Sequence, residues 1–191
     1  MKYYTLSAAF AMSAAKNYEG EFAYGSGHIN PIKAVNPGLV YEALKGDYIK
    51  MLCSIGYGVK KLRLISGDNS TCPKKSDNIS PKDLNYPSMA AEIMPLKLFK
   101  ISFNRTVKNV GFANSTYTAK IFPNSKLNFK VVPGVLSFKS LNEKKSFALF
   151  VTGRGMLAKS WVSASLVWSD GTHSVRSPII LHNQLVHVTS P

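Results

Sequence analysis

Apolar and polar residues alternate through the C-terminal half of the chain, most regularly between positions 161 and 169. The apolar residues at every second position there are Val162, Ala164, Leu166 and Trp168. This is the period of a strand with one buried face. Asp170-Gly171 follows, and its glycine supplies the positive φ that a tight hairpin turn favours. The pattern predicts an antiparallel strand pair over 161–180, which needs partner strands to bury its apolar face.

Segments with the same strand character run back from this hairpin as far as Leu84. The candidate strands are 85–91, 99–109, 115–122, 127–132, 135–138, 145–152, 161–168 and 173–181. Turn formers such as Pro133-Gly134 separate them. Short strands at this spacing, with no convincing helix among them, predict a mainly β fold, an antiparallel sandwich of about 100 residues.

The N-terminal part of the chain has a different pattern. Residues 22–41 are rich in Gly, Pro and Asn, which indicates ordered loops on a larger body. Asp47 is predicted to be the N-cap of a helix over 48–55 that ends at Gly56. Its apolar stripe consists of Tyr48, Ile49, Leu52 and Ile55. The polar stretch 60–83 is predicted to be an exposed connector that contains the domain boundary.

Composition adds a strong positive charge. The 24 Lys and Arg residues outnumber the 10 Asp and Glu residues, and the net charge is +14, which favours anionic partners in general. The lysines are scattered, so a solvated basic surface is favoured over nucleic-acid binding. No apolar run approaches the roughly 18 residues of a membrane span. Lys2 followed by the moderately apolar stretch 5–15 leaves a weak secretory signal open.

Cysteines and glycosylation sequons favour a secretory origin. Cys53 and Cys72 stand 19 positions apart and are a candidate disulfide, with two free thiols as the alternative. A bridge would stabilise the fold by about 3 kcal/mol in the chain-entropy model. The candidate N-glycosylation sites are Asn69, Asn78, Asn104 and Asn114. A single sequon is weak evidence, but this cluster beside a cysteine pair points to secretion.

Neither a catalytic site nor a metal site is predicted from the residue pattern. The histidines are His28, His173, His182 and His187, and they lie near no Gly-x-Ser-x-Gly pattern. His28 is predicted to anchor a loop and His173 to be a surface strand residue. His182 and His187 form a poor metal pair because carboxylates are not nearby. We therefore expect no cofactor.

A set of short motifs runs in order through most of the chain. They are Phe22-Ala-Tyr-Gly-Ser-Gly-His-Ile-Asn-Pro31, Asn36-Pro-Gly-Leu-Val-Tyr41, Asp47-Tyr48, Leu52-Cys53, Gly56-Tyr57, Leu84-Asn-Tyr-Pro-Ser88, Arg105-Thr-Val107, Asn109-Val-Gly111 and Leu166-Val-Trp-Ser-Asp-Gly171. In order and spacing they resemble plant subtilisin-like serine proteases (subtilases) of the cucumisin type, over about residues 17–181. The resemblance implies a fibronectin type III-like sandwich that opens at Leu84, in agreement with the fold predicted from periodicity.

The resemblance also implies a division of the chain and an activity. Residues 1–60 would be a short helical and loop remnant of a subtilisin-like peptidase domain, 61–83 a connector and 84–191 the sandwich. The family cleaves peptide bonds with an Asp, His and Ser triad and an oxyanion Asn, but these motifs lie upstream of the segment that corresponds to Phe22. No family catalytic residue carries over, and we expect no peptide hydrolysis. Apolar surface on the helix over 48–55 should be exposed because the peptidase core is missing.

Three functions remain open on this reading. The first is the C-terminal part of a subtilisin-like endopeptidase, from a truncated gene or a partial gene model, which contacts a peptidase domain or a protein substrate. The second is a stand-alone secreted glycoprotein module that binds a protease or acidic cell-wall polysaccharide. The third is complementation of a separately made peptidase domain. The resemblance implies an extracellular location, in the apoplast or cell wall, and leaves the oligomeric state open.

Overall fold

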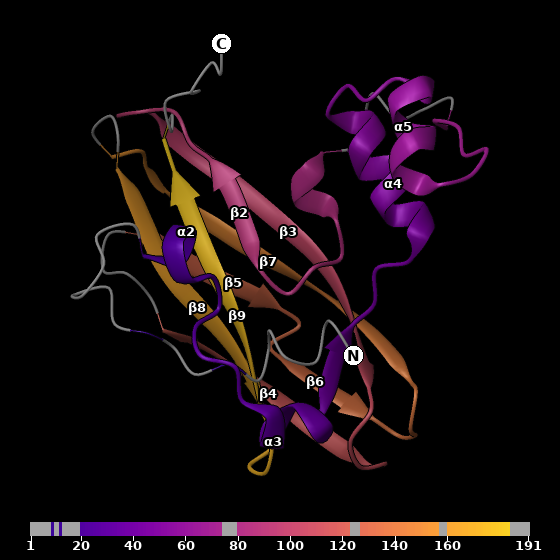
Figure 1. The fold of residues 1–191 in the computed structure, drawn as a ribbon. Coiled ribbons are helices and arrows are strands. Elements are labelled where there is room, and N and C mark those ends of the chain that lie inside the picture. Colours follow the sequence, from indigo (N-terminus) through magenta and orange to yellow (C-terminus); the bar gives the residue numbers. More distant parts are fainter. Residues whose placement is uncertain are drawn as a thin grey trace.

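The computed structural model describes residues 9, 12, 20–73, 80–122, 127–156 and 160–183. Two β-sheets lie face to face around the hydrophobic core (Figure 1), with strand orders β1-β3-β7-β5 and β2-β9-β8-β4-β6. The strands are β1 (Leu39–Tyr41), β2 (Met89–Glu92), β3 (Leu98–Asn109), β4 (Ser115–Phe122), β5 (Leu127–Val132), β6 (Val135–Phe138), β7 (Lys144–Arg154), β8 (Trp161–Ser169) and β9 (Ser174–His182). The mainly β sandwich predicted from alternation is confirmed.

Neighbouring strands of the two sheets pair antiparallel, except β2 and β9, which run parallel with Met89 opposite Ile179. The hairpin predicted over 161–180 is β8–β9, paired from Trp161 opposite His182 onward. Most predicted strands lie within two residues of the observed ones. The first differs because β2 begins at Met89 rather than at residue 85.

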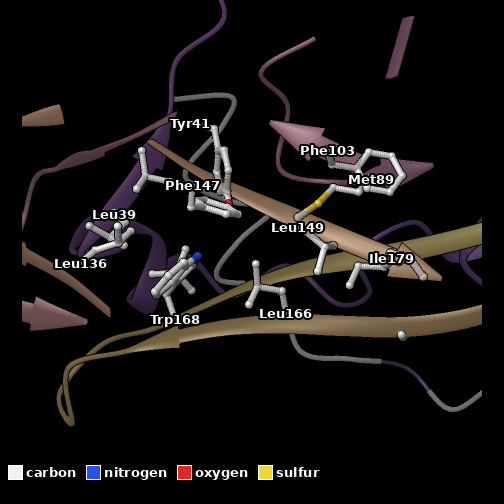
Figure 2. Close-up of a cluster of buried hydrophobic side chains, with 14 of the residues drawn as sticks. Leu39, Tyr41, Met89, Phe103, Leu136, Phe147, Leu149, Leu166, Trp168 and Ile179 are labelled. Carbon is white, nitrogen blue, oxygen red and sulfur yellow. The ribbon is translucent and has the colours of Figure 1, made fainter. Parts of the chain in front are cut away.

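Alternating side chains of both sheets fill the core. Trp168 of β8 is fully buried, and its ring meets that of Phe147 on β7 edge-on with the centroids 5.1 Å apart (Figure 2). Tyr117 and Phe138 make a second edge-on contact at 6.0 Å. The β8 residues that alternate in the sequence are the buried ones, Val162, Ala164, Leu166 and Trp168. Removing this apolar surface from water is the main force that holds the sheets together.

The sandwich includes a strand from the segment that the resemblance assigns to the peptidase domain. β1 pairs antiparallel with β3, with Leu39 opposite Asn109 and Tyr41 opposite Val107. Leu39 and Tyr41 belong to the core, and the Tyr41 hydroxyl lies 2.8 Å from the Ser177 hydroxyl. Burial raises the pKa of Tyr41 to about 12. The division into 1–60, 61–83 and 84–191 stays a prediction, but β1 is structurally part of the sandwich.

The helices are α2 (Glu21–Tyr24), α3 (Pro31–Val35), α4 (Lys45–Ser54), α5 (Val59–Ser66) and the 3-10 helix η3 (Pro81–Asp83). The prediction that Asp47 caps a helix starting at residue 48 is wrong, because Leu44 precedes the first turn of α4. Asp47 instead lies inside that turn, where its carboxylate accepts the Leu44 N–H at 2.9 Å. A carboxylate there satisfies a free donor and suits the positive end of the helix dipole.

The stretch 60–83 was expected to be an exposed connector, but residues 60–66 belong to helix α5. Whether the stretch separates two domains stays a prediction. Gly67 ends α5 in a left-handed conformation with φ 69°. Helices α4 and α5 stand together to one side of the two sheets (Figure 1). Of the predicted apolar stripe on α4, Ile55 is exposed and the others are half-buried. None of the described helices is long and apolar enough to cross a membrane.

Candidate functional site

The histidines occupy separate places in the fold. His28 is exposed in the loop between α2 and α3, whereas His182 on β9 packs edge-on against Phe22 with the ring centroids 5.7 Å apart. His187 lies outside the described residues, as does most of the candidate signal over 5–15. Within the described ranges, His, Cys, Asp and Glu side chains form no group of three or more that could hold a metal ion.

His173 and Asp170 form a buried pair at the β8–β9 turn. The prediction of a surface position for His173 is wrong, because only 6% of the residue is exposed. Its Nδ1 lies 2.8 Å from Oδ2 of Asp170, and the backbone N–H groups of Thr172 and His173 donate to Oδ1. Burial alone would raise the pKa of Asp170, but these hydrogen bonds outweigh it and lower the pKa. The ionised carboxylate therefore holds the turn together.

The surroundings of this pair indicate a structural role. An Asp–His pair serves catalysis when the other ring nitrogen reaches a nucleophile. Here Nε2 of His173 is buried and has no hydrogen-bond partner among the described residues. A Cβ added to Gly38 would lie 2.7 Å from His173 Cβ and from the Tyr117 hydroxyl. The pair therefore packs against the loop before β1 and leaves no space there for a substrate.

A second polar cluster attaches the segment before β2 to the sandwich. The Asn85 Nδ2 donates to the carbonyls of Glu42 and Thr106, both at 2.9 Å. The buried Arg105 guanidinium donates to the carbonyls of Tyr86 (2.9 Å), Lys82 (2.9 Å) and Ser88 (3.3 Å). Burial lowers the pKa of Arg105. These contacts give the Leu84–Ser88 and Arg105–Val107 motifs a structural purpose: they hold the entry into β2 against β3.

The segment over 20–38, here called the N-terminal strap, lies across the outer face of β8 and β9 (Figure 1). Glu21 accepts a hydrogen bond from the Ser163 hydroxyl, and the Arg176 guanidinium donates to the Ser26 carbonyl. Phe22 meets Trp161 edge-on with the centroids 6.3 Å apart. Burial lowers the pKa of Arg176. The strap is thus fastened to the sandwich by both polar and aromatic contacts.

The C-terminal part of the strap, around α3, carries an exposed apolar surface. Ile29, Ile32 and Val35 are 72%, 87% and 85% exposed. They lie in and just before α3, and Asn30 caps this short helix by accepting the Lys33 N–H. Side chains this exposed contribute nothing to the core of the sandwich. We call these three residues the α3 apolar surface and treat it as the candidate docking site.

A hollow of about 660 Å³ with several charged residues in its lining lies where α4 adjoins the four-stranded sheet. Glu42 bridges two lysines of this sheet, with its carboxylate 2.8 Å from Lys144 Nζ and 3.0 Å from Lys108 Nζ. The hydrogen bonds from Lys144 and Lys108 lower the pKa of Glu42. Asn85 and Asn104 contribute to the same lining. The hollow therefore offers positively charged hydrogen-bond donors from the lysines, a negatively charged acceptor from Glu42 and neutral amide groups from the asparagines.

The predicted modification sites lie mostly on the surface. Cys53 and Cys72 are joined by a disulfide that links the end of α4 to the segment after α5. Asn69, Asn104 and Asn114 are exposed, while Asn78 falls outside the described residues. Glycosylation of these asparagines stays a prediction.

Two packed sheets with this strand order define a fibronectin type III-like β-sandwich. The chain belongs to the fibronectin type-III domain family, whose model matches residues 83–181. It is 57% identical over 164 residues to "Subtilisin-like protease SBT4.4" of Arabidopsis thaliana. This match covers 85% of this chain and 22% of that protein. It is 55% identical over 172 residues to "Subtilisin-like protease SBT4.6" of the same plant, covering 90% and 23%. The homology to plant subtilisin-like proteases expected from the motifs is therefore confirmed.

The chain thus spans about a quarter or less of the length of the curated relatives it matches. Among solved structures, a FixG-related protein from Vibrio parahaemolyticus is 8% identical, with a TM-score of 0.36, and the match covers 49% of this chain and all of that one.

Proposed function

We propose that the chain is the C-terminal, non-catalytic part of a subtilisin-like serine endopeptidase and that its sandwich supports the peptidase domain. The exposed α3 apolar surface carries this proposal. Soluble proteins seldom leave several large apolar side chains side by side in water unless a partner covers them. Residues 29–35 lie within the strap, between its contacts to β8–β9 at Glu21 and Ser26 and strand β1, so the surface is held in place for a partner.

The relatives supply the chemistry of that partner. They are named subtilisin-like proteases, and this chain matches 22–23% of their length. Their remaining length is where a peptidase domain would lie. We therefore expect the covering surface to be apolar and to belong to a peptidase domain of this kind. We also expect an extracellular location, since a disulfide and a cluster of sequons such as this chain carries are typical of proteins made in oxidising compartments.

The proposal is tested by mixing the purified chain with the peptidase part of SBT4.4, made separately. We expect association in analytical ultracentrifugation, and we expect Ile32→Ser with Val35→Ser to weaken it at least tenfold. The matched control is Met94→Gln with Leu98→Ser, which removes two similarly exposed apolar side chains, one from the β2–β3 loop and one from the first position of β3. No association, or equal weakening by both pairs of substitutions, would contradict the proposal. The chain alone should not cleave a fluorogenic peptide.

A second function, binding of acidic cell-wall polysaccharide, is favoured by one observation. The outward face of the four-stranded sheet carries several lysines, of which Lys100 and Lys130 line a hollow of about 370 Å³. Together with the net charge of +14, this face suits a polyanion. Salt-sensitive retention on polygalacturonate that is lost in Lys100→Gln with Lys130→Gln would support it. If retention survives these substitutions, the binding comes from the overall positive charge of the protein and not from this face.

A further inference from the structure

Asn104 lies near the middle of β3, on the face of the four-stranded sheet that points away from the core. Its neighbours along the strand, Phe103 and Arg105, are buried, whereas Asn104 is exposed. Side chains alternate between the two faces of a strand, so Asn104 points outward. It begins the sequon Asn104-Arg-Thr106, and glycans require such an outward, solvent-facing position.

The strand register places a row of small and apolar residues beside Asn104. Ala148 on β7 is directly opposite Asn104, and Val132 on β5 is directly opposite Ala148. Val132 is 43% exposed. Asn104 and Val132 both line the hollow of about 660 Å³, and the small methyl group of Ala148 lies between them in the register.

Phe150 lies on the same outward face as Asn104 and Val132. It is opposite Ser102 on β3 and Lys130 on β5, which places it diagonally from Asn104. Diagonal neighbours in antiparallel sheets are about 7–8 Å apart, within the reach of an aromatic side chain. Phe150 is half-buried, and it is not among the partly buried apolar residues that pack against the core. Its ring therefore lies on the outward face, where it lines the hollow of about 370 Å³ with Val132.

We infer that Asn104 carries an N-linked glycan whose first sugars lie along this face and stack on Phe150. A pyranose ring has an apolar face of C–H groups, and an aromatic ring presents a negative face that attracts such groups. The sugar hydroxyls need hydrogen-bond partners, and the hollow that Asn104 and Val132 line also offers Glu42, Lys108 and Lys144. The occupant is attached to the very face that it covers, so no separate partner has to be recruited.

The glycan on Asn104 would then cover the outward face of the four-stranded sheet. Without the glycan, Phe150 and Val132 would face water on an open sheet. With it, these two apolar side chains are covered by the sugar rings. The inference rests on the proposed passage through the secretory pathway but not on docking to a peptidase.

The test is secretion of the full chain from insect cells behind a foreign leader peptide, so that native targeting does not enter. Mass spectrometry of the glycopeptide should show occupancy of Asn104. Nuclear Overhauser contacts should join the first GlcNAc to the Phe150 ring. Removing the sequon by Asn104→Gln, or by Thr106→Val with Asn104 intact, should lower Tm by about 2–4 °C.

Three controls separate the glycan from the side-chain changes. Asn69→Gln removes an exposed sequon after α5 and should change Tm by less than about 1 °C. The same Asn104→Gln substitution in unglycosylated protein from bacteria should leave Tm unchanged. In the Phe150→Ala background, loss of the Asn104 sequon should no longer lower Tm. An unmodified Asn104, an equal effect of Asn69→Gln and Asn104→Gln, or additive effects of the Asn104 and Phe150 substitutions would each overturn the inference.

Discussion

The side chain of Asn85 binds the backbone of Thr106 through both of its polar atoms, with Nδ2 2.9 Å from the carbonyl oxygen and Oδ1 2.9 Å from the amide nitrogen. The amide thus imitates a neighbouring strand at a point where no strand lies. Because Nδ2 also donates to the Glu42 carbonyl, one side chain connects three separate segments.

Replacing Asn85 with alanine should therefore lower the free energy of unfolding by about 1–3 kcal/mol, since backbone groups lose their partners away from bulk water. Urea denaturation of the purified chain measures this. Asn128→Ala, at an exposed position on β5, should shift it by less than about 0.5 kcal/mol. Equal midpoints for Asn85→Ala and the parent would show that the three contacts do not contribute.

Gly38 is predicted to tolerate no side chain. Its φ of 79° is unfavourable for other residues, and an added Cβ would lie 2.7 Å from His173. Gly38→Ala should cost about 2–4 kcal/mol through strain and displacement of the His173 ring. Gly46→Ala in α4 meets no atom within 4 Å and should instead stabilise by up to about 1 kcal/mol. Chemical denaturation should show a lower free energy of unfolding for Gly38→Ala and a higher one for Gly46→Ala.

The ionised Asp170 should make stability depend on acid pH. Its pKa in the folded protein is lowered, so its contribution is complete above the unfolded pKa of about 3.9 and is lost as the pH falls through the folded value. Asp170→Asn should be less stable than the parent at pH 7. The difference in unfolding free energy should shrink below about pH 4. A difference that stays constant down to pH 2 would rule out this linkage.

The Cys53–Cys72 disulfide is predicted to stabilise the α4–α5 unit rather than the sandwich. It spans 19 positions, which corresponds to about 3 kcal/mol in the chain-entropy model. Cys53→Ala with Cys72→Ala should accelerate amide hydrogen exchange in 45–66 and leave the strands β3 and β7 protected. Faster exchange in β7 as well would mean that the helices and the sheets unfold together.

The location of the strands could be predicted from local pattern because strand alternation is a local property. Residues 161–169 alternate over enough positions for the buried face to be identified, and Val162 to Trp168 are buried as expected. β1 has three residues, all of them buried, so it offers no period to detect. Helix α5 was not predicted because its basic residues led us to interpret 60–83 as an exposed connector. The glycines on either side, Gly58 and Gly67, are signals for the start and end of a helix of this length.

The candidate site was less accessible to sequence reasoning. The family resemblance placed the exposed apolar surface on the helix over 48–55, whereas Ile29, Ile32 and Val35 are the most exposed large apolar side chains of the described residues before β1. Their exposure depends on where the strap is fastened, through Glu21 to Ser163 and Arg176 to Ser26. These contacts join residues more than 100 positions apart. No local window contains both partners.

The sequence by itself determined the sandwich, the inward face of most strands, the sequons and the homology to plant subtilisin-like proteases. These depend on residue order over short distances, which a single chain displays directly. The tertiary structure alone decided that 39–41 enters the sheet, that His173 is buried behind Gly38 and that Asn104 shares a face with Phe150. The physical reason is that strand register and burial are set by distant segments packing together, and one strand's pattern does not state which neighbour it will meet.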